Sequence, residues 1–188
     1  ADLVGAGTAQ CILGNHELNL LLRHKKPENG WFEGDESRGN GCEVAADEPG
    51  RDFVIDFFGS LPMALERSDL RVVHACWDEA AIEEVRRHSD AGGLYRDHRA
   101  RIDQELSGRG ELDQVDINLV CQNENPVRMI TSGPEERAAE KHFAGGRWRE
   151  EQRVRWWESP GDGPACVFGH YSMPVDEPHA FGSAFCVD

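Results

Sequence analysis

Three short stretches of this sequence place a side chain that can bind a metal or move a proton directly after an apolar run. Asn15 and His16 follow Ile-Leu-Gly, His74 follows two valines, and His170 follows Val-Phe-Gly. An amide oxygen and two neutral imidazoles form a mixed O/N donor set, which suits Mn²⁺, Fe²⁺ or Zn²⁺ better than Ca²⁺. A histidine can also exchange a proton near neutral pH. Either chemistry requires the three stretches to meet in the folded chain.

Each stretch coincides with the end of a predicted buried strand. Apolar runs bounded by turn residues predict strands over 10–13, 70–74 and 165–168. In sheets covered by helices, ligands gather at the carboxyl ends of the strands. Gly14 and Gly169 stand at two of these ends, where a backbone without Cβ can turn sharply and come close to an ion. The pattern predicts an α/β fold in which the three strand ends form one site.

The remaining elements are predicted to frame these strands. A hairpin is expected from residues 63–66 and 70–74, and a strand from 126–131. Helices are expected over 17–23, 52–60, 78–87 and 135–143, with a peripheral helical insertion around 94–120. Residues 147–157 alternate arginines with aromatic side chains, which favours a half-exposed strand with Trp157 on the arginine side. Phosphate contact by one of these arginines is the alternative function.

Composition favours one soluble domain. The 188 residues are 39% hydrophobic and 29% charged, with a formal net charge of −15. Such acidity repels nucleic-acid backbones, so no nucleic-acid binding is expected. No apolar stretch approaches the roughly 20 residues of a membrane span, and no basic, apolar leader is visible. Six cysteines without a Cys-x-x-Cys pair, five of them in apolar runs, indicate buried free thiols and a cytoplasmic location.

Three motifs together resemble the calcineurin-like metallophosphoesterases. They are Gly-Asn-His-Glu at 14–17, Val-His-Ala-Cys-Trp-Asp at 73–78 and Gly-His-Tyr at 169–171. Their order and spacing resemble the family's third, fourth and fifth motifs. The similarity is greatest to bacterial members related to phosphoprotein phosphatases and symmetrical diadenosine-tetraphosphate hydrolases. It extends over nearly the whole chain, including Thr-Ser-Gly-Pro at 131–134 and the arginine and tryptophan run at 153–157.

The resemblance implies a fold and roles for individual residues. The fold would be an αββα sandwich of two packed sheets with helices outside. Asn15, His74 and His170 would bind the second ion of a two-metal site, and His16 would protonate the leaving oxygen. Two divalent ions (Mn, Fe or Zn) would activate a water molecule for in-line attack on phosphorus. Asp78 would stand behind the His74 loop.

Several family features are missing from the 188 residues. Neither the Asp-x-His motif nor the Gly-Asp-x-x-Asp-Arg-Gly motif that supplies the first metal site occurs. Residues 1–188 are therefore expected to be one incomplete domain, a fragment of a longer protein that holds at most one partial metal site and is inactive alone. Ser-Met-Pro follows the third motif where the subgroup carries Trp-Arg, and Leu13 replaces a usual arginine. The substrate-binding residues thus stay unassigned.

Three functions remain open. The first is hydrolysis of a phosphate ester or phosphoanhydride by the longer protein. Its substrate would be a phosphorylated small molecule, a dinucleoside polyphosphate or a phosphoprotein. The second is a catalytically inactive protein that keeps the fold for binding or regulation. The third is a protein with one isolated transition-metal site.

Overall fold

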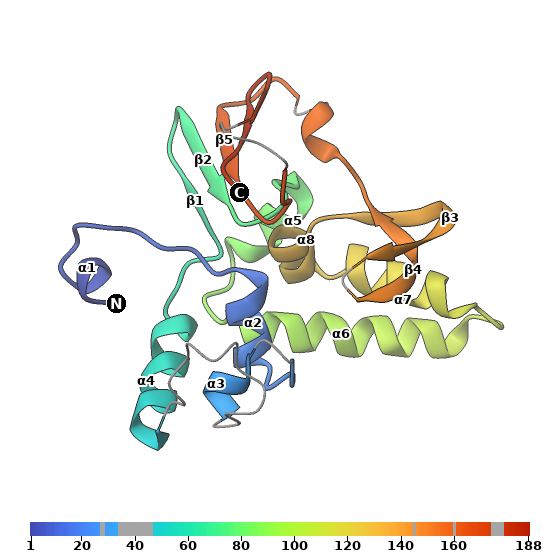
Figure 1. Cartoon of the computed structure of the whole chain (residues 1–188), viewed down its shortest axis with the longest axis horizontal. Coiled ribbons are helices and arrows are strands. Elements are labelled where there is room, and N and C mark those ends of the chain that lie inside the picture. The colour runs from blue at the N-terminus through green and yellow to red at the C-terminus, as the bar shows by residue number, and fades with distance from the viewer. Residues whose placement is uncertain (27–28, 34–46, 145, 160, 174–178) are drawn as a thin grey trace.

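Two of the three predicted site loops leave a mixed five-stranded sheet. The computed structural model describes residues 1–26, 29–33, 47–144, 146–159, 161–173 and 179–188 (Figure 1). The sheet contains β1 (Ala64–Glu66), β2 (Leu70–Val73), β5 (Ala165–Phe168), β7 (Ala184–Cys186) and β6 (His179–Phe181), in that spatial order. Strands β2, β5 and β7 run parallel, while β1 and β6 pair antiparallel at the two edges. The three parallel strands therefore end at the same edge of the sheet.

Helices and a separate hairpin complete the described fold. The helices are α1 (Asp2–Gly5), α2 (Asn15–Leu21), α3 (Gly30–Glu33), α4 (Glu48–Gly59), α5 (Glu79–Val85), α6 (Ala91–Gly108), α7 (Gln114–Asn123) and α8 (Pro126–Ser132), with a 3₁₀ helix, η2, at Trp156–Glu158. Helix α8 packs against α2, α5, α6 and α7, and α7 supports the two-stranded hairpin of β3 (Glu135–Ala144) and β4 (Arg147–Arg153). In Figure 1, α1 and α4 lie at the left and this hairpin at the right. This arrangement confirms a mixed α/β fold.

Local sequence explains where several helices begin. The side chains of Asp78, Asp90 and Asp113 each accept a hydrogen bond from the backbone N–H three residues later, at the start of α5, α6 and α7. Such caps satisfy backbone donors that a helix leaves unpaired at its first turn. The predicted helices around 94–120 are present as α6 and α7, and Leu94 and Ile102, two of the few apolar residues of this region, are buried.

The core forms where the sheet meets α2, α5 and α8. Its fully buried members include Leu13 before α2, Val73, Phe168 and Ala184 of the sheet, and Val127 and Ile130 of α8. Leu18 of α2 and Ile82 of α5 are buried beside them. An aromatic cluster of Trp157, Phe168 and Tyr171 extends this core beside β5. Trp157 is therefore buried, and the prediction that it lies on the arginine side of a continuous strand is wrong. Strand β4 ends at Arg153, and the chain turns there into η2.

Two element predictions are wrong, the first because of helix-start signals in the sequence and the second because of strand pairing. Residues 126–131 form α8 instead of a strand, because Asn125 accepts hydrogen bonds from the N–H groups of Val127 and Arg128 and Pro126 suits a first helical turn. Residues 135–143 form β3 instead of a helix. The helix-prone Glu and Ala residues of this stretch pair with β4 from Glu135–Arg153 to Ala144–Arg147, and this pairing overrides their propensity.

The predicted strand over 10–13 is also wrong. Within the described part of the chain, its backbone makes one bond across the fold, from Leu13 N–H to the Pro62 carbonyl, so no ladder forms. Leu13 is buried, but Cys11 is exposed, contrary to expectation. The cysteines of the other apolar runs are buried free thiols, as predicted, and Cys42 lies outside the described residues. Across those residues, no helix combines the length and apolar character that crossing a membrane demands.

Candidate metal centre

Asn15, His74 and His170 meet in the folded chain. Asn15 opens α2, His74 directly follows β2, and His170 lies two residues beyond β5. The Nε2–H of His74 donates to Oδ1 of Asn15 over 2.9 Å. The imidazole rings of His74 and His170 lie 5.3 Å apart between centroids. Three stretches separated by up to 155 positions in sequence therefore share one location.

The parallel pairing of β2 with β5 brings the two histidines together. Because both strands end at the same sheet edge, the residues that follow them emerge side by side. The N–H of Gly169 donates to the carbonyl oxygen of His74 over 3.0 Å and ties the two loops to each other. The N–H of Ala75 donates in turn to the Ile130 carbonyl, which anchors the His74 loop to α8. Backbone bonds thus fix both imidazole-bearing loops.

Gly14 allows Asn15 to reach His74. A Cβ at position 14 would lie 2.8 Å from Cε1 and 2.9 Å from Nδ1 of His74, which is closer than real Cβ atoms come. The Glu17 carboxylate accepts the Gly14 N–H over 3.0 Å and holds the start of α2 in place. Glycine is therefore required here for close approach, although its backbone φ of −104° is ordinary.

His170 has an uncommon backbone conformation. Its φ is 69°, in the left-handed region that residues with a Cβ rarely occupy. The Arg153 guanidinium donates to the His170 carbonyl oxygen over 3.0 Å and stabilises this turn. Such strain commonly marks functional positions, because only the surrounding structure can maintain it. Here it directs the loop after β5 toward His74.

Two of the donor atoms have a spacing that fits one edge of a metal site. Ligands in adjacent octahedral positions at about 2.1 Å from an ion lie about 3 Å apart, which matches the separation of Asn15 Oδ1 and His74 Nε2. No group of three or more His, Cys, Asp or Glu side chains is placed to hold an ion within the described ranges. A metal here would depend on the Asn15 amide oxygen and on donors from elsewhere.

Burial keeps both imidazoles in the neutral form that binds metals. Burial lowers the pKa of His170 to about 3, assisted by the positive charges of Arg153, His74 and His16. Burial also lowers the pKa of His74; Glu17 and Asp188 oppose this decrease and His16 adds to it. A neutral imidazole has one unprotonated ring nitrogen; for Nε2 of His74 to bind an ion, the proton that it donates to Asn15 would first have to move to Nδ1.

Acidification is expected to destabilise the fold through these histidines. Unfolded histidines titrate near pH 6.5 and the folded ones at lower pH, so the unfolded chain binds more protons between pH 6.5 and about 3. Stability present above pH 6.5 is therefore lost as the pH falls. His24 and His98 act in the same direction, because burial lowers their pKa values too.

The urea unfolding free energy measures this effect. Between about pH 7.5 and about pH 5 it should fall on the order of 1 kcal/mol through His170 after solvent screening, and further in the same direction through His74, His24 and His98. His170→Asn keeps a residue that tolerates positive φ and should show a smaller pH dependence. If the unfolding free energy of this variant depends on pH as strongly as that of the unmodified chain, His170 is not a source of the acid destabilisation.

His16 and Asp78 lie near the expected positions. His16 is exposed on the first turn of α2, and its charge acts on both His74 and His170. Asp78 caps α5 by accepting the Ala81 N–H over 2.8 Å, which gives it a structural role close to the His74 loop. The role of His16 as a proton donor stays a prediction.

Asp188 was not singled out from the sequence. It follows β7, which lies parallel to β5, so it emerges at the same sheet edge as the histidines. Its carboxylate lies beside Gly169 and acts electrostatically on His74. His74 and His170 were selected because each lies just past an apolar strand. The same rule applied to β7 would have selected Asp188.

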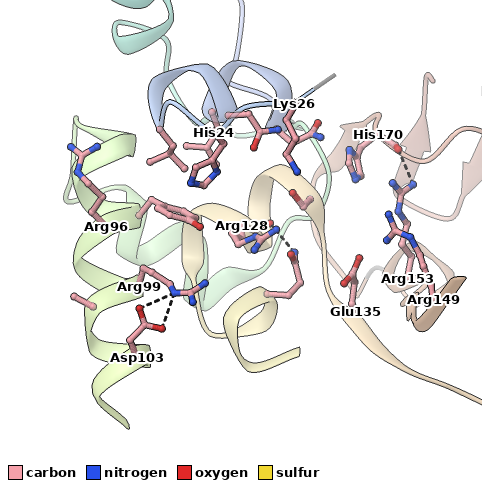
Figure 2. A pocket seen from close by; sticks show the side chains of 18 of the residues that line it. His24, Lys26, Arg96, Arg99, Asp103, Arg128, Glu135, Arg149, Arg153 and His170 are labelled. Atoms are coloured by element: carbon pink, nitrogen blue, oxygen red, sulfur yellow. Dashed lines mark hydrogen bonds and ion pairs between the residues drawn. The ribbon is translucent and has the colours of Figure 1, made fainter. Parts of the chain in front are cut away.

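A cationic cavity of about 800 Å³ opens beside the centre (Figure 2). Asn15 and His170 line one part of it, whereas His74 and His16 are not among its lining residues. Lys26 and six arginines also line it, namely Arg96, Arg99, Arg128, Arg147, Arg149 and Arg153, against the two acidic residues Asp103 and Glu135. Three of the four arginines of 147–157 line the cavity, and that stretch carried a sequence signal, while Arg99 and Arg128 could not be predicted because tertiary packing alone brings them here.

The chain matches no known family model, no curated protein and no solved structure.

Proposed function

We propose that this chain is part of a metal-dependent phosphoesterase that hydrolyses a phosphate ester or phosphoanhydride. The observation that carries the proposal is the meeting of Asn15, His74 and His170, with Asn15 Oδ1 and His74 Nε2 2.9 Å apart. One amide oxygen and two neutral imidazoles form a donor set for Mn²⁺, Fe²⁺ or Zn²⁺. The adjacent cationic cavity supports a negatively charged substrate.

Each residue has a separate task in this proposal. Asn15, His74 and His170 would hold one divalent ion. Bound ions would neutralise charge on the phosphoryl oxygens and activate water for attack on phosphorus. His16, exposed beside these residues, would donate a proton to the leaving oxygen. The arginines of the cavity would orient the phosphate and lower the energy of its negative charge.

The proposal includes the αββα sandwich of the family that the three motifs resemble. The five-stranded sheet is consistent with one of the two sheets of such a sandwich. Turnover is proposed for a chain that also carries the Asp-x-His and Gly-Asp-x-x-Asp-Arg-Gly motifs, because these carboxylates would hold the other ion. The alternative, an inactive protein that keeps the fold for binding, predicts that one of these carboxylate motifs is lost. An isolated metal site predicts tight binding of one ion without them.

Metal stoichiometry and turnover test the proposal together. The 188-residue chain is expected to bind about one Mn²⁺ weakly and not to hydrolyse p-nitrophenyl phosphate. A form extended at its amino end by a sequence with both carboxylate motifs should bind a second Mn²⁺ and turn over. Calorimetry and p-nitrophenol release measure the two properties. Robust turnover by the short chain, or absence of Mn²⁺ binding by both forms, contradicts the proposal.

A further inference from the structure

The cavity beside the candidate metal centre contains arginines without a carboxylate partner. Many arginines outside the cavity form ion pairs with acidic residues: Arg67 with Asp69, Arg71 with Glu66, Arg87 with Glu83, Arg109 with Glu105 and Arg137 with Asp113 and Asp116. Within the cavity, Arg99 is likewise paired with Asp103. In contrast, no carboxylate of the described residues forms an ion pair with Arg128, Arg149 or Arg153.

Unpaired cations are unexpected in so acidic a chain. The sequence has 35 acidic residues against 20 lysines and arginines. The side chains of Arg128 and Arg149 are also partly buried, so each has lost part of its hydration. A partly desolvated charge without a partner costs free energy, and an anion entering the cavity would recover it.

Structural contacts hold these three arginines in place. The buried side chain of Asn125 bonds the N–H of Arg128 and donates to the Tyr95 carbonyl, which fixes the first turn of α8. Arg149 and Arg153 lie four positions apart on β4 and donate to the carbonyl oxygens of Ala144 and His170. The guanidinium of Arg153 also lies 5.2 Å from the centroid of the Tyr171 ring. The guanidinium groups of Arg149 and Arg153 are thus held by the protein, while for Arg128 the fixed helical turn sets where the side chain starts.

These cations surround one opening. Figure 2 shows Arg149 and Arg153 beside His170 on one side, Arg128 on the opposite side, and Lys26 between them. The volume of about 800 Å³ is in the range of cavities that hold a whole small molecule, and it exceeds the needs of one phosphate group. Since Asn15 and His170 border the same space, a ligand at the metal centre would extend toward Arg128.

We propose that this cavity binds the remainder of an oligophosphate substrate, a molecule with at least two linked phosphates. The reacting phosphate would lie at Asn15 and His170, and the phosphates beyond it would contact Arg128, Arg149 and Arg153. The position of the reacting phosphate rests on the function proposed above. The anion-binding role of the arginines does not, because it requires no metal.

Charge distribution favours a short phosphate chain over other anions. Planar guanidinium groups form paired hydrogen bonds with phosphate oxygens, and successive phosphates match several arginines around one space. A long nucleic acid would have to approach a protein with a net charge of −15, which repels its backbone outside the cavity. A compact polycarboxylate such as citrate carries a similar charge, but its charged groups are not spaced along a line as successive phosphates are.

Calorimetry in EDTA with the whole 188-residue chain tests the proposal without metal. Tripolyphosphate is expected to bind about ten-fold more tightly than inorganic phosphate or citrate, with an affinity that falls as salt rises. Arg128→Gln and Arg149→Gln should each weaken tripolyphosphate binding about ten-fold. Arg67→Gln, which removes an exposed arginine paired with Asp69, should change it less than about two-fold.

The proposal is overturned if the unmodified chain binds tripolyphosphate, inorganic phosphate and citrate with equal affinity. It is also overturned if Arg67→Gln loses as much tripolyphosphate affinity as Arg128→Gln and Arg149→Gln. A nucleoside triphosphate in place of tripolyphosphate separates the two sources of the phosphate chain: tighter binding assigns a nucleotide, and equal binding assigns the phosphate chain alone. Arginine-dependent tripolyphosphate binding, with no Mn²⁺ binding by either the 188-residue chain or its extended form, would retain the anion site while rejecting the proposed hydrolysis. Mn²⁺ binding without tripolyphosphate binding would reject the anion site and leave the proposed hydrolysis standing.

Discussion

Replacing Gly133 by alanine is expected to destabilise the protein by about 2–6 kcal/mol, a large part of a typical folding free energy. Gly133 follows α8 with φ 77° and ψ 169°, a conformation that is essentially restricted to glycine. A Cβ at this position would overlap the Tyr171 hydroxyl and lie 2.9 Å from Cζ of that ring. The free-energy costs of backbone strain and of steric overlap therefore add. Thermal unfolding should show a decrease of about 5–20 °C.

Matched variants separate the two causes. Gly161 also has a positive φ, 72°, but a Cβ there would meet nothing within 4 Å, so Gly161→Ala should show strain alone. Tyr171→Phe removes a buried hydroxyl that has no hydrogen-bond partner among the described atoms. The double variant Gly133→Ala/Tyr171→Phe should thus recover part of the lost stability. Equal destabilisation by Gly133→Ala and Gly161→Ala would contradict the overlap.

Replacing Gly14 by alanine is expected to weaken Mn²⁺ binding about 10- to 100-fold, close to the loss in His74→Ala. The new Cβ would lie 2.6 Å from the Glu17 carboxylate and less than 3 Å from two atoms of His74. The ring must move away from Asn15, and the 2.9 Å contact between their donor atoms is then lost. Calorimetric titration with Mn²⁺ measures the change in the unmodified chain and in both variants.

The control for this prediction is Gly108→Ala. Gly108 ends α6, and a Cβ there would meet nothing within 4 Å, so this variant should bind Mn²⁺ as the unmodified chain does. His88→Ala serves as a second control, because His88 is exposed and its Nδ1 bonds the Glu84 carbonyl instead of facing the centre. A Gly14→Ala variant with unchanged Mn²⁺ affinity would show that His74 does not need its observed position.

Helix and strand boundaries were predictable where short-range signals decided them. Asp78 before an apolar periodic run indicated α5, and the Ser-Asp turn at residues 68–69 indicated the hairpin of β1 and β2. The same approach failed at β3, whose Glu and Ala residues favour a helix in isolation. Pairing with β4 decided the outcome there. Information about that partner strand is not contained in the propensity of 135–143 itself.

By itself the sequence determined the identity of Asn15, His74 and His170 as candidates, because each follows an apolar run at a place where strands or helices begin or end. Tertiary structure alone decided that they meet, since the parallel pairing of β2 and β5 places both histidines at one sheet edge. It also decided that Arg128, from α8, faces the same cavity as Arg149, from the separate hairpin. Chemistry of single residues is local and can be read along the chain, whereas convergence of distant segments depends on packing.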